Sequence, residues 1–237
     1  MDKGICAVSV ASLRAENSHQ SELTSQLLYG ETVDILKISG DFYKVKMHFD
    51  GYEGFVSTNQ ISFISEEFLT NRKVEVLQES CDFFHLPEGR TLLSIGSEIN
   101  SESNIPLPKL TSENIIETAK QFLNVPYLWS GRSFFGIDCS GFVQLVYKLY
   151  GIYLPRNSFQ QAEIGEVLSF VEESKPGDLA FFENQDGQIC HVGIMLNHQE
   201  IIHAFGKVRI DSLDSTGIFN KDLKKHTHKL RFLRSIF

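Results

Sequence analysis

Residues 138–143 read Asp-Cys-Ser-Gly-Phe-Val, and this stretch decides both the fold and the chemistry that the sequence predicts. Apolar residues recur behind it at helical spacing until Gly151, which is typical of a helix with a glycine at its C-terminal end. Asp138 is a suitable N-cap, so Cys139 falls in the first turn, where unpaired N–H groups and the helix dipole favour a negative sulfur. We therefore expect Cys139 to be a nucleophile whose pKa lies below the ordinary thiol value of about 8.5.

Two predicted strands follow this helix, and each carries a histidine. Residues 190–196 and 200–205 are apolar runs separated by a short polar segment, which indicates two strands joined by a turn. We expect Leu196 to pair with Glu200. In that register the two histidines are diagonal neighbours on one face of the sheet, roughly 7–8 Å apart between Cα atoms.

The pair of histidines suggests a catalytic triad. His191 could act as the general base for Cys139, and His203 could orient the ring of His191. The alternative is a core cysteine with two ordinary strand histidines. Three reactive groups on suitable elements favour catalysis.

Six short motifs occur in order after residue 111. They are Pro-Tyr-Leu-Trp-Ser-Gly at 126–131, Asp-Cys-Ser-Gly-Phe-Val at 138–143, Leu-Pro-Arg-Asn-Ser at 154–158, Lys-Pro-Gly-Asp-Leu at 175–179, His-Val-Gly-Ile at 191–194 and Ile-His-Ala-Phe-Gly at 202–206. In this order they resemble the NlpC/P60 family of papain-like cysteine peptidases, where Ser130 departs from a usual glycine. The resemblance implies an α+β fold, with helices packed on an antiparallel sheet, for residues 111–237.

The first hundred residues indicate a different kind of domain. Short strand-like runs at 6–10, 32–38, 42–47 and 52–57 alternate with turn signals, which is typical of a small β-barrel. Motifs at 12–14, 28–31 and 51–56 resemble a bacterial SH3 (SH3b) domain. We expect this SH3b-like barrel to occupy residues 1–100. Further strands at 66–96 are attached to it or form a second, degenerate barrel.

A polar segment with two prolines at 101–110 is predicted to be the linker between the domains. A helix should follow it, with Ser112 as the N-cap. Its apolar face should comprise Ile115, Ile116, Ala119, Phe122 and Leu123. The strands expected after the Cys139 helix lie at 179–183, 190–196, 200–205, 208–210 and 229–237, an α+β order of helices before strands.

Composition narrows the class of protein. The chain has 237 residues and a formal net charge of −8, which disfavours nucleic acid as a partner. Neither a signal peptide nor an 18-residue apolar run is evident, so we expect a cytoplasmic protein with no membrane partner. The four cysteines show no metal-ligand spacing, and we expect neither a metal nor a cofactor.

The resemblance is nearest to SH3b-linked members that hydrolyse the γ-D-glutamyl–diamino acid bond of murein peptides with a free N-terminal L-Ala. It implies that these peptides are the substrate. The candidate residues of the substrate site are Tyr127, Asp138, Ser140, Arg156, Ser158, Glu22 and Tyr52.

Two charged groups of the substrate would need partners in this site. Asp138 could hold the free ammonium, because a buried charge needs a partner, and the resemblance implies that Glu22 and Tyr52 grip the same amine. Arg156 and Ser158 would hold the α-carboxylate that a γ-linked D-glutamate leaves free. Each residue also has a purely structural alternative. Tyr127 could be a packing aromatic and Tyr52 a core tyrosine, while Asp138 and Ser158 could be helix caps. Arg156 could form a surface ion pair, and Glu22 could be a solvated carboxylate.

Two other functions remain open at this stage. The chain could be an amidase or acyltransferase of the same family with another acyl substrate. It could instead be a non-catalytic binding protein that uses its SH3b domain. The complete set of Cys139, His191 and His203 argues against the second.

Overall fold

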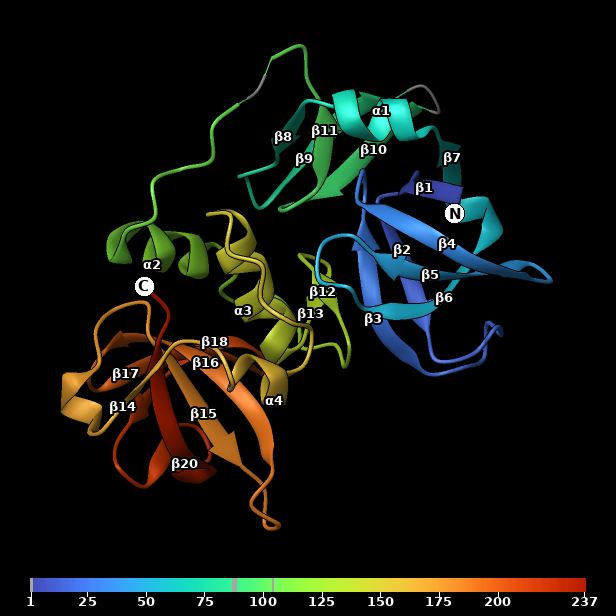
Figure 1. Cartoon of the computed structure of the whole chain (residues 1–237). Helices are drawn as coiled ribbons and strands as arrows, with labels where there is room; N and C mark the ends of the chain where they lie inside the picture. Colours follow the sequence, from blue (N-terminus) through green and yellow to red (C-terminus); the bar gives the residue numbers. More distant parts are fainter. Residues whose placement is uncertain (1, 87–88, 104) are drawn as a thin grey trace.

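The computed structural model describes residues 2–86, 89–103 and 105–237. It has an N-terminal seven-stranded sheet, a small connecting region, and a C-terminal barrel on which helices pack (Figure 1). The predicted α+β class, with an SH3-like sheet domain first and the helix-covered antiparallel sheet second, is confirmed.

The N-terminal sheet is antiparallel, with strand order β3-β2-β6-β5-β4-β1-β7. Its strands are β1 (Asp2–Cys6), β2 (Val10–Arg14), β3 (Leu23–Leu28), β4 (Thr32–Ser39), β5 (Phe42–Met47), β6 (Glu53–Ser57) and β7 (Ile61–Ile64), with a 3₁₀ turn, η1 (Thr58–Gln60), before β7. The predicted strand at 6–10 is wrong. Cys6 ends β1 and Val10 begins β2, because the chain turns there from pairing with β4 and β7 to pairing with β3.

The connecting region contains a helix that the sequence did not predict, α1 (Glu66–Asn71), whose N-cap Ser65 accepts a hydrogen bond from Phe68 N. Its strands are β8 (Val74–Val76), β9 (Cys81–Leu86), β10 (Gly89–Ser94) and β11 (Glu98–Asn100). They pair as two separate two-stranded sheets, β9 with β10 and β8 with β11. Within the described residues, this region is therefore not a second barrel. Pro87 and Glu88, which belong to the segment 66–96 where further strands were expected, lie outside the described residues.

Helix α2 (Ser112–Gln121) opens the second half of the chain. Its N-cap is Thr111, whose side chain accepts from Asn114 N, so the expected cap at Ser112 is wrong by one residue. The expected apolar face is buried except for Leu123, which is 37% exposed. The helix ends before Leu123, which therefore leaves the stripe that faces the core.

Helix α3 (Cys139–Lys148) is buried over its whole length, although its sequence resembles a one-faced amphipathic helix. The face that carries Gln144 and Lys148 is covered by the N-terminal domain and the connecting region: Gln144 donates to Asp50, and Lys148 donates to Glu31 and to Gly96 O. The neighbouring short elements are β12 (Arg132–Ser133), β13 (Gly136–Ile137) and α4 (Ser158–Gln161).

The C-terminal strands are β14 (Glu166–Leu168), β15 (Leu179–Glu183), β16 (Ile189–Asn197), β17 (Glu200–Phe205), β18 (Lys207–Leu213), β19 (Gly217–Asn220) and β20 (Lys225–Ser235), with a 3₁₀ turn, η2 (Val171–Glu173), before β15. The sheet has the order β14-β20-β15-β16-β17-β18-β19. An additional pairing of β19 with β20 closes six of these strands into a barrel. Strand β20 also pairs with β14 and β15, which are distant from it in sequence.

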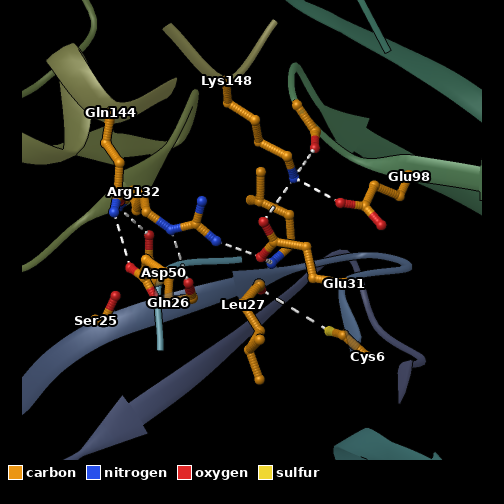
Figure 2. A network of polar contacts seen from close by, with 12 residues as sticks. Cys6, Ser25, Gln26, Leu27, Glu31, Asp50, Glu98, Arg132, Gln144 and Lys148 are labelled. Atoms are coloured by element: carbon orange, nitrogen blue, oxygen red, sulfur yellow. Dashed lines mark hydrogen bonds and ion pairs between the residues drawn. The ribbon is translucent and has the colours of Figure 1, made fainter. Parts of the chain in front are cut away.

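A polar network joins the two domains (Figure 2). The Glu31 carboxylate, 1% exposed, pairs with Arg132 of β12 and with Lys148 of α3, and Lys148 also pairs with Glu98. The backbone N–H of Arg132 donates to Gln26 of β3. These contacts fix the N-terminal sheet against the elements that carry the predicted nucleophile.

Candidate active site

Cys139 is the first residue of α3, and the loop before it holds the helix start in place. The Asp138 carboxylate caps the helix by accepting from Gly141 N at 2.7 Å. A Cβ at Gly141 would lie 2.4 Å from the carbonyl oxygen of Gly131, so glycine is required there for the helix to touch the loop. Ser130 in the same loop has a φ of 60°, the left-handed region in which a non-glycine residue costs about 1–2 kcal/mol.

The helix start packs against β16 next to the first histidine. The backbone N–H of Val192, the residue after His191, donates to the Cys139 sulfur. Helix α3 also contacts β17, which carries His203. The two strands and the helix therefore meet where the sequence predicted the nucleophile and the base.

Register between β16 and β17 places the histidines close together. Gly193 lies opposite His203, so His191 is the diagonal neighbour of His203, as expected. The expected pair of Leu196 with Glu200 is wrong, because a bulge makes Asn197 the partner of Glu200. A Cβ at Gly193 would lie 2.9 Å from the Cβ of His203, so the glycine of the His-Val-Gly motif allows this close pairing.

A chain of hydrogen bonds runs inward from His191. Its Nε2 lies 2.8 Å from His203 Nδ1, and His203 Nε2 lies 3.2 Å from the Asp211 carboxylate. All three side chains are at most 5% exposed. Asp211 also pairs with Arg209 of its own strand β18 and accepts from Asn220 of β19, so its position is fixed by both strands.

Asp211 was missed in the sequence, although a signal for it exists. Gly206 marks the turn between β17 and β18, and the resulting register pairs His203 with Arg209. Asp211 is two residues further along β18 and is therefore the diagonal neighbour of His203 on the same face. A third histidine, His228, was also missed. Its ring stacks on His191 with centroids 4.1 Å apart, and no local pattern signals this contact because it depends on the long-range pairing of β20 with β15.

The electrostatics of the resting site differ from our expectation for the thiol. Burial, together with the Asp138 carboxylate, raises the pKa of Cys139 to about 12, and the N–H of Val192 opposes this only in part. Burial, with His228 and His203, holds the pKa of His191 well below its usual range. The prediction of a low thiol pKa is therefore wrong for the resting site, because desolvation outweighs the helix N-terminus. The resting pair is a neutral thiol and a neutral imidazole.

Arg156 has a different place from the one predicted. Its guanidinium forms a two-pronged pair with Asp138, at 3.1 and 2.6 Å, and donates to Ser140 and to Ser25 of the N-terminal domain. At 2% exposure it is an internal ion-pair partner rather than a surface one, and its donors are directed into the protein instead of toward a substrate carboxylate. Ser140 also donates to Asp138, so these residues form one cluster behind the nucleophile.

The remaining candidates lie around this cluster. Tyr127 is half-buried, and burial, together with Cys139 and Asp138, raises the pKa of its hydroxyl to about 12, which places it beside the nucleophile. Tyr52 is close enough to Arg156 to contribute, after burial, Asp138 and Cys139, to the pKa of the guanidinium. Ser158 is buried as the first residue of α4, and Asn157 occupies the N-cap position without a side-chain hydrogen bond to the helix.

Glu22 reaches the catalytic domain from the N-terminal sheet. Its carboxylate accepts a hydrogen bond of 3.1 Å from the indole N–H of Trp129, two residues after Tyr127. Trp129 is 63% exposed, so this contact lies at the surface, where the two domains meet. Both SH3b candidates thus lie at the boundary with the catalytic domain.

Comparison with known proteins agrees with this architecture. Residues 124–228 match the NlpC/P60 family, and residues 13–61 match the bacterial dipeptidyl-peptidase Sh3 domain. A solved NlpC/P60 family protein from Bacillus cereus has the same fold, with a TM-score of 0.84, 21% identity and 99% of each chain covered.

Three curated relatives are similar in sequence. Dipeptidyl-peptidase 6 of Lysinibacillus sphaericus is 27% identical over 272 residues, covering 92% of this chain and 95% of the relative. The γ-D-glutamyl-L-lysine dipeptidyl-peptidase of Bacillus cereus is 28% identical, covering 79% of this chain and 68% of the relative. The protein of the same name from Bacillus subtilis is 40% identical over 120 residues, covering 48% of this chain and 40% of the relative. The chain therefore combines an NlpC/P60 domain at residues 124–228 with a bacterial SH3 domain of the dipeptidyl-peptidase type at residues 13–61, and it is homologous to these dipeptidyl-peptidases.

Proposed function

We propose that this protein is a cysteine peptidase that hydrolyses the bond between γ-D-glutamate and the diamino acid of murein peptides with a free N-terminal L-Ala. The observation that carries the proposal is Cys139 at the start of α3, packed against the strand that bears the hydrogen-bonded His191 and His203. The names of two relatives, which are γ-D-glutamyl-L-lysine dipeptidyl-peptidases, support this choice of the bond that is cleaved.

The geometry supports a general-base mechanism. His203 Nδ1 is bonded to His191 Nε2, which leaves His191 Nδ1 as the nitrogen that can take the thiol proton. Asp211 accepts the Nε2 proton of His203, so His203 Nδ1 is an acceptor and holds the Nε2 proton of His191. Both tautomers are therefore set from Asp211 outward.

The reaction then proceeds in two steps. Substrate binding excludes water as Cys139 attacks the γ-carbonyl carbon, and its proton moves to His191. The N–H of Cys139 lies outside the helical hydrogen-bond ladder and can donate to the oxyanion. His191 gives its proton to the amine of the departing diamino acid. Water, deprotonated by His191, attacks the thioester and releases L-Ala-γ-D-Glu, and the departing Cys139 sulfur takes the proton back from His191.

Specificity for a free amine would come from the domain boundary. Glu22 and Tyr52 approach from the N-terminal domain, and Asp138 lies behind Cys139. Among the residues that the structure describes, Arg156 alone donates to Asp138 Oδ2, so this oxygen retains capacity to accept from an ammonium. An acyl group or a muramyl sugar on the alanine nitrogen would remove the positive charge that these groups favour.

We place the reaction in the cytoplasm, in the recycling of murein peptides. All four cysteines are free, as is usual for proteins in a reducing compartment. Within the described residues, no helix combines the length and apolar character needed to cross a bilayer.

The test is direct. L-Ala-γ-D-Glu-L-Lys and its diaminopimelate counterpart are incubated with the protein and with Cys139→Ala, and products are identified by mass. The proposal predicts L-Ala-γ-D-Glu and the free diamino acid from the unsubstituted protein alone. Release of a different fragment, or acyl transfer to an added amine without hydrolysis, would favour the amidase or acyltransferase alternative.

A further inference from the structure

Three histidines converge beside the nucleophile, one more than the reaction needs. They are His191 on β16, His203 on β17 and His228 on β20. One ring nitrogen from each lies within 4.8 Å of the other two. The His228 ring stacks on His191 at an angle of 25° and meets His203 edge-on at 84°, so the three rings share one small volume.

The chemistry of this cluster suits a transition-metal ion. Imidazole nitrogens bind Zn²⁺ only when they are unprotonated, and burial lowers the pKa of all three rings, that of His228 to about 4. The lone pairs are therefore available at neutral pH.

The surroundings of His203 strengthen the case. A metal-bound histidine usually donates its other ring N–H to a carboxylate, which fixes the ring. His203 already has this arrangement, since its Nε2 is held by the buried Asp211 and its Nδ1 points at His191. Asp211 is in turn held by Arg209 and Asn220.

We propose that His191, His203 and His228 form a binding site for a divalent transition-metal ion, Zn²⁺ in the first instance, and that the bound ion inhibits the enzyme. Zn–N bonds of about 2.0–2.1 Å require nitrogens about 3.4 Å apart. Binding of an ion therefore requires rotation of these side chains to bring the three nitrogens to that spacing. The ion would replace the hydrogen bond between His191 and His203 and occupy the nitrogens that set the tautomers. It is thus an inhibitor of the reaction and not its cofactor.

Cys139 is the main confounding group, because a thiol near a histidine can bind zinc by itself. The decisive protein is therefore Cys139→Ala, which retains all three histidines and does not depend on the proposed substrate. Titration calorimetry with ZnCl₂ should show one ion per chain. Replacement by Co²⁺ should give the visible absorption of a nitrogen-ligated ion.

The ligand role of His228 is tested in the same background. His228→Phe keeps a ring for stacking but has no donor nitrogen, and His228→Gln covers the case in which phenylalanine disturbs the fold. Each should weaken zinc binding at least ~100-fold. The matched control is His226→Phe, an exposed histidine of the same strand that pairs with Asp214, and it should leave the affinity unchanged.

Two results would overturn the proposal. One is equal zinc affinity in Cys139→Ala and in folded Cys139→Ala/His228→Gln. The other is zinc inhibition of the unsubstituted enzyme with no zinc binding to Cys139→Ala, which would assign the inhibition to the thiol.

Discussion

At the scale of single residues, Cys139 is subject to two opposing influences. The start of α3 and the N–H of Val192 stabilise a thiolate, whereas burial and Asp138 disfavour it and raise the pKa of the thiol to about 12. The result is a nucleophile that forms when His191 takes its proton, and not a thiolate that waits for substrate.

This predicts slow alkylation of the resting enzyme. Iodoacetamide should label Cys139 more slowly than a model thiol at pH 7, and the rate should continue to rise above pH 8.5, because only a small fraction of the thiol is ionised at lower pH. The measurement is peptide mapping by mass over a pH series, with His191→Ala as the control. Labelling faster than the model thiol at pH 6–7 would show a thiolate–imidazolium pair in the resting site.

The second residue-scale prediction ranks the members of the relay. Loss of kcat should be largest for His191→Ala, smaller for His203→Ala and smallest for Asp211→Asn, because each acts one step further from the thiol. The relevant measurement is kcat for each variant, with folding checked by circular dichroism. Equal kcat for His191→Ala and His203→Ala would remove the support for separate roles as base and orienting group.

Sequence reasoning at this scale succeeded where contacts are local or follow from one hairpin. The diagonal placement of His191 and His203 depends only on the β16–β17 register, apart from the bulge near the turn. Arg156 was assigned to a substrate carboxylate because its burial partner, Asp138, could not be inferred from a separation of 18 residues. His228 lies on β20, which reaches the strands of the site through its long-range pairing with β15.

At the scale of elements, the start of α3 combines a helix cap and a buried ion pair. Asp138 caps the helix through Gly141 N and pairs with Arg156, and both side chains are largely buried. Breaking a buried pair by removal of one partner leaves an uncompensated charge, which is strongly destabilising.

Asp138→Asn should therefore lower the free energy of unfolding by about 3–5 kcal/mol, although asparagine can still cap the helix. Asp138→Ala should cost about 1 kcal/mol more through loss of the cap. Urea denaturation measures both values. The control is Asp138→Asn/Arg156→Gln, which should recover part of the loss; equal instability of the single and double variants would contradict the ion-pair account.

Element boundaries were predicted within a residue or two where a cap or glycine marks them. Helix α2 begins at Ser112, and Thr111 is its N-cap. Threonine and serine are both suitable N-caps, so the sequence did not decide between these two neighbours. Helix α1 was missed because six residues are too few for a hydrophobic repeat to show. The full burial of α3 was missed because its polar residues, Gln144 and Lys148, find their partners mainly in other parts of the chain.

At the scale of the whole molecule, one buried carboxylate links the domains. Glu31 of the N-terminal domain is held by Arg132 and Lys148 of the catalytic domain. Burial alone would raise the pKa of Glu31, but the two cations outweigh it and lower the pKa. No sequence pattern predicts this contact, because its members are about 100 residues apart.

Glu31→Gln should lower the free energy of unfolding by about 3–5 kcal/mol at pH 7, since it leaves buried cations short of a partner. Because the folded-state pKa is lowered, the stabilisation is present above the unfolded value of about 4.3 and is lost as pH falls through the folded value. The difference between wild type and variant should therefore shrink below about pH 4. Denaturation at several pH values tests this. The control is Glu117→Gln, which removes an exposed ion pair with Lys120 on α2 and should change the free energy of unfolding by no more than about 0.5 kcal/mol. A difference that persists unchanged at the lowest pH would contradict the charge account.

The central claim is that the two domains together select a peptide with a free N-terminus. If Glu22, Tyr52 and Asp138 hold the ammonium, acylation of the alanine nitrogen removes the charge they bind and leaves carboxylates unpaired. Glu22→Gln should reduce the resulting selectivity while leaving the labelling rate of Cys139 unchanged, because Glu22 contacts Trp129 and not the nucleophile.

The most direct measurement is the ratio of kcat/KM for L-Ala-γ-D-Glu-L-Lys to that for the same peptide acetylated on the alanine nitrogen. The account predicts a ratio of at least ~100, which corresponds to about 2.7 kcal/mol in transition-state binding. A ratio near one, accompanied by release of peptides from intact cell walls, would contradict it and identify a wall hydrolase instead.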